Sequence, residues 1–324
     1  MRVVRSFSVI DSHTAGHPTR VIFSGVPALQ GGTVKAQRDD FRATHDDLRG
    51  LLLHEPRGHA AMVGLVPVPS RSADYGALFI SSYIYLDMCG HATIGFAKTI
   101  ASTGQLKPHT PRFTLETPAG IVSVDLAWDT QGELEQVTLT NVPSYLGARD
   151  VVITSADGLS VHADLVYGGV WYAIVDAAEA GLTLDPDHAG KAMLLGAAVK
   201  AAYVFLAKDR PDLPQVEPSV LFVAEDGPAE ARHLVVLASN KFDRSPCGTG
   251  TSARLAQLHA RGRLAAGQPY KARSILGTTF NAMIADVLPS GAITPRVSGI
   301  AHISAFSTIV CEGGDPLAQG FLCR

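Results

Sequence analysis

Short alternating runs of apolar and polar residues recur along most of the chain and predict β-strands. The run GALFISSYIY at 76–85, rich in β-branched and aromatic residues, is typical of them. The other expected strands cover 3–10, 20–23, 112–116, 121–126, 136–141, 165–166, 170–175, 221–224, 233–238, 282–288, 294–298 and 302–310. Helical spacing predicts helices at 45–54, from about 91 to 104, at 187–206 and after Cys247. Short strands with few helices favour an α+β fold over a doubly wound parallel sheet.

Composition narrows the class of protein. A length of 324 residues predicts two domains, and 46% hydrophobic residues indicate well-packed cores. The net charge of −3, without runs of like charge, gives no reason to expect nucleic acid or an acidic membrane surface as a partner. We expect neither a signal peptide nor a membrane span, because no segment approaches 18 uninterrupted apolar residues. Four cysteines do not make a disulfide scaffold, so a reduced, cytoplasmic protein is expected.

Two segments that begin at a cysteine align without a gap and indicate an internal repeat. They read CGHATIGFAKTIASTGQL from Cys89 and CGTGTSARLAQLHARGRL from Cys247. The shared positions are a glycine after the cysteine, a threonine at the fourth position, a second glycine and a leucine: Gly90 and Gly248, Thr93 and Thr251, Gly104 and Gly262, Leu106 and Leu264. We interpret the repeat as two related domains, each with one helix that starts at a cysteine.

A cysteine at a helix start suggests proton-transfer chemistry. Unpaired N–H groups and the helix dipole stabilise a thiolate there, which predicts a lowered cysteine pKa, and they bind a substrate carboxylate. Two such helix starts facing each other across a cleft would hold a carboxylate between two sulfurs. One thiolate would remove the proton from the adjacent carbon while one thiol delivers a proton to the opposite face. The pair Cys89 and Cys247 therefore predicts racemisation or epimerisation.

Other residues of these segments are weaker candidates. His91 and Thr249 could donate to the carboxylate, or serve only packing and helix capping. Asp243 could pair with a substrate ammonium, or be an ordinary turn residue. No GxGxxG follows a strand and GTGTS lacks the P-loop lysine, so no cofactor is expected. No CxxC or HxxxH pattern supports a metal.

Two rival classes remain open at this point. A cysteine hydrolase would pair Cys89 with His91, but residues two apart on a helix do not face each other. A hydrolase also gives no reason for the second cysteine, and a non-enzymatic binding protein would need neither.

The blocks IDSHTAGHPTRVIFSG, EPRGHAAMVG, MCGHATIG, NVPSY, DLVYGGVWYA and DRSPCGTGTSARLA resemble the signature blocks of the proline racemase superfamily, in the family's order. The resemblance implies a fold like that of diaminopimelate epimerase. That fold has two similar lobes, each a sheet or barrel wrapped around a central helix, with the active site between them and no cofactor. It also implies an N-terminal lobe of residues 1–130 and about 302–324 carrying Cys89, and a C-terminal lobe of 131–301 carrying Cys247.

The resemblance also implies roles for individual residues. Cys89 and Cys247 match the two catalytic thiols, and Asp243 matches the aspartate that holds the substrate's ring nitrogen. His91, with the backbone of Gly90, Gly248 and Thr249, matches the groups that bind the carboxylate.

The expected partner is a small amino acid, proline or a hydroxyproline, and a homodimer is left open. Two cysteines favour inversion over the 3-hydroxyproline dehydratases of the family, although His17 and Ala92 depart from the usual racemase pattern. Val63 and Leu237 stand where proline-restricted members carry phenylalanines, which favours a substrate with a ring hydroxyl.

Overall fold

The computed structural model describes residues 2–227 and 229–323. The chain divides into two compact units, unit 1 comprising Met1–Leu139 with Ile300–Arg324 and unit 2 comprising Thr140–Gly299. Each unit has its own buried apolar core. The lobe boundaries expected from the sequence, after 130 and after 301, fall near these divisions.

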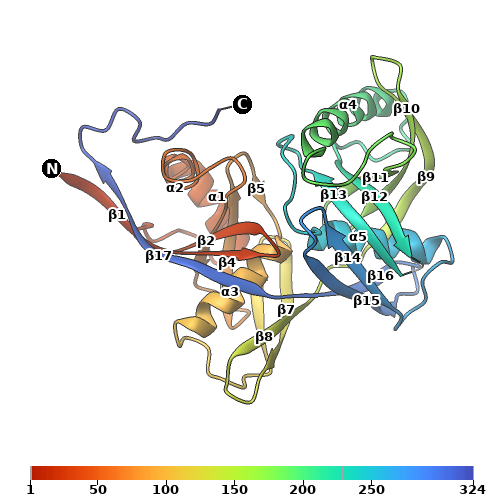
Figure 1. The fold of residues 1–324 in the computed structure, drawn as a ribbon. Helices are drawn as coiled ribbons and strands as arrows, with labels where there is room; N and C mark the ends of the chain where they lie inside the picture. The colour runs from red at the N-terminus through yellow and green to blue at the C-terminus, as the bar shows by residue number, and fades with distance from the viewer. Residues whose placement is uncertain (1, 228, 324) are drawn as a thin grey trace. The chain divides into compact units, whose positions relative to one another are not determined.

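The sheet of unit 1 is completed by a strand from the other end of the chain (Figure 1). Its order is β17(Ala301–Glu312), β1(Val3–Thr14), β2(His17–Ser24), β3(Val63–Val68), β4(Tyr75–Ser81), β6(Arg112–Thr117) and β7(Gly120–Trp128). The pairs β2–β3 and β4–β6 are parallel and the others antiparallel. The short β5(Tyr85–Leu86) pairs with β4, and β8(Leu134–Thr140) leads toward unit 2.

Three helices lie in the described part of unit 1. Helices α1(Val34–Thr44) and α2(Asp47–Leu53) connect β2 to β3 and pack on β3, β4 and β6. Helix α3(Gly90–Ser102) connects β4 to β6 and packs on β1, β2, β3 and β17. Nearly every residue of α3 is buried, which suits its small residues. A Cβ at Gly95 would lie 3.0 Å from the Ser12 hydroxyl oxygen and 3.2 Å from Thr19, closer than most Cβ contacts, so glycine favours the close approach of the helix to the sheet.

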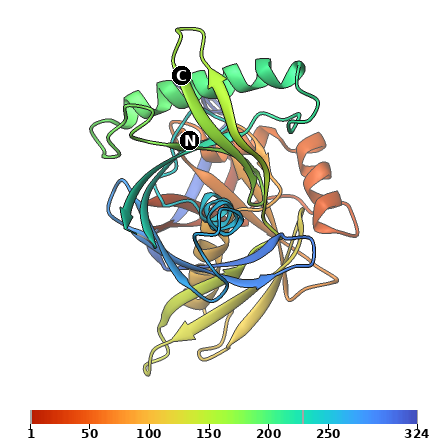
Figure 2. The same cartoon turned by 90° about the vertical axis from the view of Figure 1, so that its right-hand side faces the viewer.

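The sheet of unit 2 curls around its central helix. Its order is β9(Tyr145–Thr154), β10(Ser160–Tyr167), β11(Trp171–Asp176), β12(Ser219–Gly227), β13(Glu230–Val236), β14(Pro269–Ser274), β15(Thr279–Val287) and β16(Ile293–Gly299). A bridge between Ser144 and Ile293 joins the start of β9 to β16 and brings the two ends of the sheet together. Helix α5(Gly248–Ala260) packs on β9, β10, β11, β15 and β16, and Figure 2 shows strands around it.

The two units repeat one topology, as the cysteine segments predict. Starting from β17 in unit 1 and from β9 in unit 2, neighbouring strands pair in the same order. The first two pairings are antiparallel, and the next four are parallel, antiparallel, parallel and antiparallel. Helix α3 crosses over at the second parallel pairing of unit 1, and α5 does so at the same place in unit 2. The predicted α+β fold with two similar units is confirmed, and the topology supports a duplication.

Several elements differ from the prediction. Helix α1 and the strands β3, β9 and β14 were not predicted, and the strand expected at 76–85 breaks after Ser81. Helix α1 buries only Val34, Gln37 and Phe41, so its sequence shows little apolar periodicity; its start is fixed by Thr33, whose side chain accepts from the Ala36 N–H. Glycine, proline or charged residues interrupt the alternation in the missed strands.

Helix α4(Ala189–Lys208) lies between β11 and β12 in the chain and packs on β9, β12 and β13. Within the described residues it is the one helix long and apolar enough to cross a membrane by length and composition. The sequence prediction required an uninterrupted apolar run, which Lys191 and Lys200 break. The Lys200 side chain is buried and donates to the backbone oxygens of Leu237 and Ala238.

Candidate active site

The half-site of unit 1 is built at the start of α3. Cys89 is the N-cap residue, with extended backbone (φ −146°, ψ 107°), and its Sγ lies 3.3 Å from Nδ1 of His91. The prediction that these two side chains do not face each other was wrong. That rule holds for two residues that are both helical, whereas Cys89 precedes the helix. A proton can therefore pass between the thiol and the imidazole.

Two residues of the β1–β2 hairpin hold His91. The Thr14 hydroxyl donates to the His91 carbonyl oxygen at 2.8 Å. The His17 ring meets the His91 ring edge-on, with 4.4 Å between ring centroids, and both side chains are buried. His17, which the sequence singled out only as a departure from the family pattern, therefore lies in the half-site.

The half-site of unit 2 is built at the start of α5. Cys247 is again the N-cap, but its backbone has φ 66°, a strained conformation for a residue with a side chain. Its Sγ accepts from the Gly250 N–H at 3.4 Å and lies 3.3 Å from the Tyr172 hydroxyl oxygen. The Tyr172 hydroxyl is also 2.6 Å from the Thr249 hydroxyl, so three polar groups surround the sulfur.

The Cys247 thiol is held in its protonated form. Burial, and then the negative charge of Asp243, raise its pKa to about 12. The hydrogen bonds with Tyr172, Gly250 and Thr249 act in the opposite direction but do not offset the desolvation. The prediction that the helix start lowers the pKa is therefore wrong for Cys247, because loss of water outweighs the partial charge of the helix. A thiol of this kind is a proton donor.

The loop before Cys247 is fixed from two sides. Oδ1 of Asp243 accepts from both the backbone N–H and the hydroxyl of Ser245, and the Ser245 hydroxyl accepts from the Cys247 N–H. On the other side, burial lowers the pKa of His233 to about 3, so its ring is neutral. Because the Pro246 carbonyl only accepts, His233 Nδ1–H donates to it at 3.2 Å, and Nε2 accepts from Tyr270 at 3.0 Å.

Both helix starts present backbone donors. Gly90, Gly248 and Thr249 occupy the first turns of α3 and α5, where N–H groups have no intrahelical acceptor by position. The start of α5 also touches Gly168. A Cβ there would lie 2.3 Å from the Thr249 carbonyl oxygen and 2.7 Å from the Ala253 nitrogen, so the site requires glycine at 168.

The structure thus groups the predicted residues by unit: Cys89, Gly90 and His91 in unit 1, and Asp243, Cys247, Gly248 and Thr249 in unit 2. Sequence reasoning did not identify Thr14, His17, Tyr172, Ser245 or His233 as parts of the half-sites. Tyr172 lies within the block DLVYGGVWYA, but no spacing relative to Cys247 points to it, because the two are joined only through the fold.

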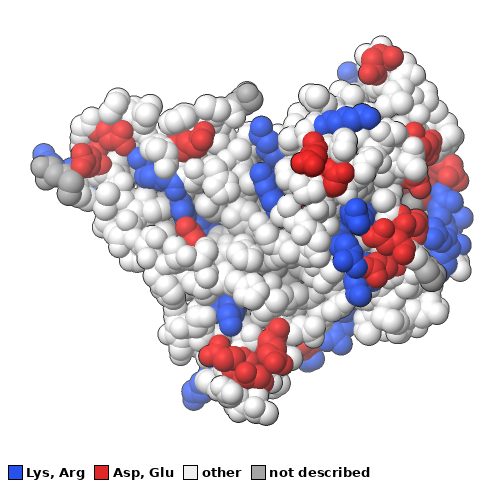
Figure 3. Space-filling model, viewed as in Figure 1, with Lys and Arg blue, Asp and Glu red and all other residues white. Residues whose placement is uncertain are grey.

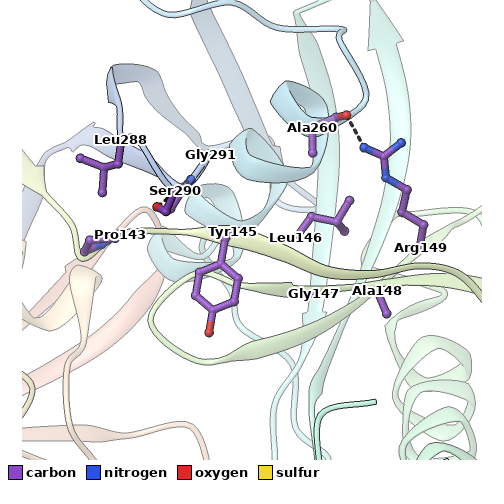
Figure 4. A pocket seen from close by; sticks show the side chains of 11 residues that line it. Pro143, Tyr145, Leu146, Gly147, Ala148, Arg149, Ala260, Leu288, Ser290 and Gly291 are labelled. Carbon is purple, nitrogen blue, oxygen red and sulfur yellow. Dashed lines mark hydrogen bonds between the residues drawn. The ribbon is translucent and has the colours of Figure 1, made fainter. Parts of the chain in front are cut away.

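Other surface features of unit 2 lie away from the sulfur. A cavity of about 650 Å³ is lined by Pro143, Tyr145, Arg149 and Ala260, among others (Figure 4). Ala260 ends α5, about 20 Å from Cys247 at a rise of 1.5 Å per residue. Acidic and basic side chains are interspersed over the face in Figure 3. Among residues 2–227 and 229–323, no group of three or more His, Cys, Asp or Glu side chains is placed to hold a metal ion.

Comparison with known proteins identifies the family. The model of the family described as proline racemase matches residues 9–322. A 4-hydroxyproline 2-epimerase from Streptosporangium roseum is 38% identical, over 99% of this chain and 100% of that protein. A proline racemase from Clostridioides difficile is 35% identical over 100% of both chains. A hydroxyproline epimerase from Agrobacterium vitis, solved with bound trans-4-hydroxy-L-proline, has a TM-score of 0.86 and 30% identity, covering 100% of this chain and 97% of that one. The chain belongs to the proline racemase family.

Proposed function

We propose that the protein is a cofactor-independent amino-acid racemase or epimerase that inverts the α-carbon of a hydroxyproline or of proline, with 4-hydroxyproline as the favoured substrate. The observation that carries this is the repeated half-site: each unit places a buried cysteine at the N-cap of its central helix. The relatives support it, since those with 37–38% identity are named as 4-hydroxyproline epimerases and one with 35% as a proline racemase.

The two half-sites suit opposite roles in proton transfer. Cys89 with His91 at 3.3 Å is proposed as the base, because the imidazole can take the thiol proton and leave a thiolate. Cys247 is proposed as the acid, because its raised pKa keeps it protonated. In one turnover the Cys89 sulfur takes the α-hydrogen as a proton, and the pair of electrons stays on the α-carbon. The Cys247 thiol then gives its proton to the opposite face. In the reverse direction the roles exchange.

The remaining residues are proposed to bind substrate. Backbone N–H groups of Gly90, Gly248 and Thr249, with His91, would hold the carboxylate and stabilise the charge that develops on it. Asp243, a carboxylate fixed by Ser245, would pair with the ring nitrogen. Because the mechanism needs reduced thiols, we also propose a cytoplasmic location.

The test is a substrate panel on the purified protein: L-proline, trans-4-hydroxy-L-proline and trans-3-hydroxy-L-proline. Polarimetry follows inversion, proton NMR in deuterium oxide follows α-hydrogen exchange, and a ketone-trapping assay follows water loss. We expect inversion with deuterium incorporation, fastest on the 4-hydroxy substrate. Water loss from the 3-hydroxy substrate without inversion of the others would identify a dehydratase and overturn the proposal.

The roles of the cysteines are tested with a matched set of variants. Cys89→Ala and Cys247→Ala each remove one thiol, and both should abolish inversion. Cys311→Ala is the control, because Cys311 is equally buried but lies in the apolar core of unit 1 away from α3. Near-normal inversion in either of the first two variants would contradict the two-thiol mechanism.

A further inference from the structure

A charged side chain lies on the buried side of helix α4. The other buried residues of this helix are small, aliphatic or aromatic: Ala189, Ala192, Gly196, Val199, Tyr203 and Ala207. Lys200 lies among them and is 2% exposed. Burial lowers the pKa of its ammonium, because the charged form loses water there. A lysine at this position therefore costs stability that an apolar residue of similar size would not, which points to a role beyond packing.

The Lys200 ammonium holds the turn that follows β13. Nζ donates to the backbone oxygen of Leu237 at 2.7 Å and to that of Ala238 at 3.2 Å. A carboxylate oxygen of Glu217 lies 3.5 Å from Nζ, but the Glu217 side chain is 53% exposed, so water screens this pair. The strong contacts of the ammonium are therefore the two carbonyl oxygens of the turn.

The backbone of Leu237 is fixed by three hydrogen bonds. Its N–H donates to the Lys241 carbonyl oxygen at 2.8 Å, and its own carbonyl oxygen accepts from the Asn240 N–H at 2.9 Å and from Lys200. Asn240, at the tip of the turn, has φ 59°, a conformation that asparagine and glycine tolerate best. Of the three bonds, the one from Lys200 comes from outside the turn and ties it to α4.

The alternation of side chains along β13 shows where Leu237 points. Val236 faces α4, since a Cβ at Gly196 would lie 2.6 Å from its Cγ2. Val235 faces the start of α5, since a Cβ at Gly250 would lie 3.2 Å from its Cγ2. Leu237 comes two residues after Val235 and continues the same ladder, so it shares the face of Val235. Its half-buried side chain therefore points toward the half-site of unit 2.

Asp243 lies on the same face, directly across from Val235. Its N–H donates to the Val235 carbonyl oxygen at 2.9 Å, and the bridge between Val236 and Phe242 continues this antiparallel pairing toward the turn. Residues directly opposite each other in such a pair share a face, so Leu237 and Asp243 are diagonal neighbours, roughly 7–8 Å apart. A five-membered ring bound to Asp243 through its nitrogen has its other atoms within reach of the Leu237 side chain.

We propose that Lys200 is a positioning residue for substrate binding: through the carbonyl oxygens of Leu237 and Ala238, it holds the Leu237 side chain against the ring of the bound amino acid. The inference rests on the proposed function, in which Asp243 pairs with the ring nitrogen. Leu237 excludes water from one side of the ring, and Lys200 keeps Leu237 in place.

The reacting thiol is held by other contacts. The backbone N–H of Cys247 donates to the Ser245 hydroxyl, which donates to Asp243, and His233 holds the Pro246 carbonyl. None of these bonds involves the turn at 237–241. Loosening the turn should therefore weaken binding of the substrate and leave proton transfer intact, which raises KM and preserves kcat.

Steady-state inversion of trans-4-hydroxy-L-proline by Lys200→Met tests the proposal. Methionine fills a similar volume without a donor, and Ala238 is exposed, so water can replace the lost bond to its oxygen. KM should rise about 10-fold, as expected for loss of hydrogen bonds from a charged group, with kcat changed by less than about 2-fold. Lys191→Met is the matched control, because the exposed Lys191 lies on the same helix and donates to the Gly181 carbonyl oxygen at 2.7 Å.

A second variant loosens the same turn from its exposed tip. Asn240→Ala places alanine at φ 59°, which alanine adopts less readily, and it leaves α4 untouched. It should raise KM and preserve kcat as Lys200→Met does, and it decides the outcome by itself if Lys200→Met does not fold. An effect of Lys200→Met on KM that Asn240→Ala does not share would overturn the role of the turn.

Amide hydrogen exchange follows the turn without reference to activity. The amides of Leu237 and Asn240 should exchange about 10-fold faster in Lys200→Met, while the Thr251 amide, which donates to the Cys247 carbonyl oxygen, should keep its rate. Unchanged exchange in the turn, an unchanged KM, or equal losses in kcat and kcat/KM would each overturn the proposal. If the parent protein inverts no substrate, the proposed function itself fails; if it does and Lys200→Met keeps its KM, the role of Lys200 alone fails.

Discussion

The neutral His233 ring under the Cys247 loop makes the stability of unit 2 sensitive to acid. The pKa of His233 falls from 6.5 to about 3 on folding, because burial and the charge of Arg254 disfavour the imidazolium. Between these values the unfolded chain binds a proton that the folded chain does not. The free energy of unfolding therefore decreases as pH falls below 6.5 and continues to decrease until about pH 3. At 1.36 kcal/mol per pH unit, His233 alone accounts for about 2 kcal/mol between pH 7 and pH 5.

The two tryptophans allow the pH dependence of unfolding to be followed in unit 2 alone. Trp128 lies in unit 1 and Trp171 in unit 2, so Trp128→Phe leaves one fluorescent reporter in the unit that contains His233. Urea unfolding would be followed at pH 7 and pH 5 with and without His233→Gln, whose amide can still donate to Pro246 and accept from Tyr270. Between pH 7 and pH 5, we expect the free energy of unfolding to fall by about 2 kcal/mol more in the protein with His233 than in the His233→Gln variant. Equal losses in the two proteins would refute the buried, neutral histidine.

Two further substitutions test the geometry around Cys247. Tyr172→Phe removes a hydroxyl that lowers the thiol pKa and contacts Thr249, so kcat/KM for inversion should fall about 10- to 100-fold, as expected for loss of one hydrogen bond to a charged group. The pH optimum of the Tyr172→Phe variant should move upward, because a group that lowers the Cys247 pKa is lost. An unchanged pH–rate profile would show that inversion does not use the contact between the Tyr172 hydroxyl and the Cys247 sulfur. Gly168→Ala should displace the start of α5, with a loss of more than about 100-fold in kcat/KM and a lower melting temperature. Gly190→Ala is the control, because a Cβ there meets nothing within 4 Å, and it should leave kcat/KM and the melting temperature unchanged. Equal effects of Gly168→Ala and Gly190→Ala would contradict the argument that α5 approaches Gly168 too closely for a side chain.

The sequence predicts the cysteine helices well because their signal is local. Glycine, threonine and small residues recur at the same positions after Cys89 and Cys247, and these positions decide where each helix begins and how closely it packs. Helix α1 and strand β9 show the opposite case. Both elements pack against segments that are distant in the sequence, so the apolar pattern within each element is weak.

The protonation of the thiols could not be predicted from local sequence. A helix start by itself lowers the pKa of a cysteine, but Cys247 is enclosed by Tyr172 and the loop at Asp243, and their positions depend on the whole of unit 2. The same holds for His17 and His91, whose contact depends on the β1–β2 hairpin lying beside the start of α3.

The return of β17 to unit 1 has a consequence for the order in which the protein is made. Strand β17 pairs with β1 along its whole length, from Ala301 with Thr14 to Glu312 with Val3. Unit 2 is one continuous segment, whereas unit 1 lacks this strand until after all of unit 2 has been synthesised. On the ribosome, the unit that carries Cys247 can therefore fold first. The unit that carries Cys89 keeps β1 as an open edge until residues 301–312 have emerged.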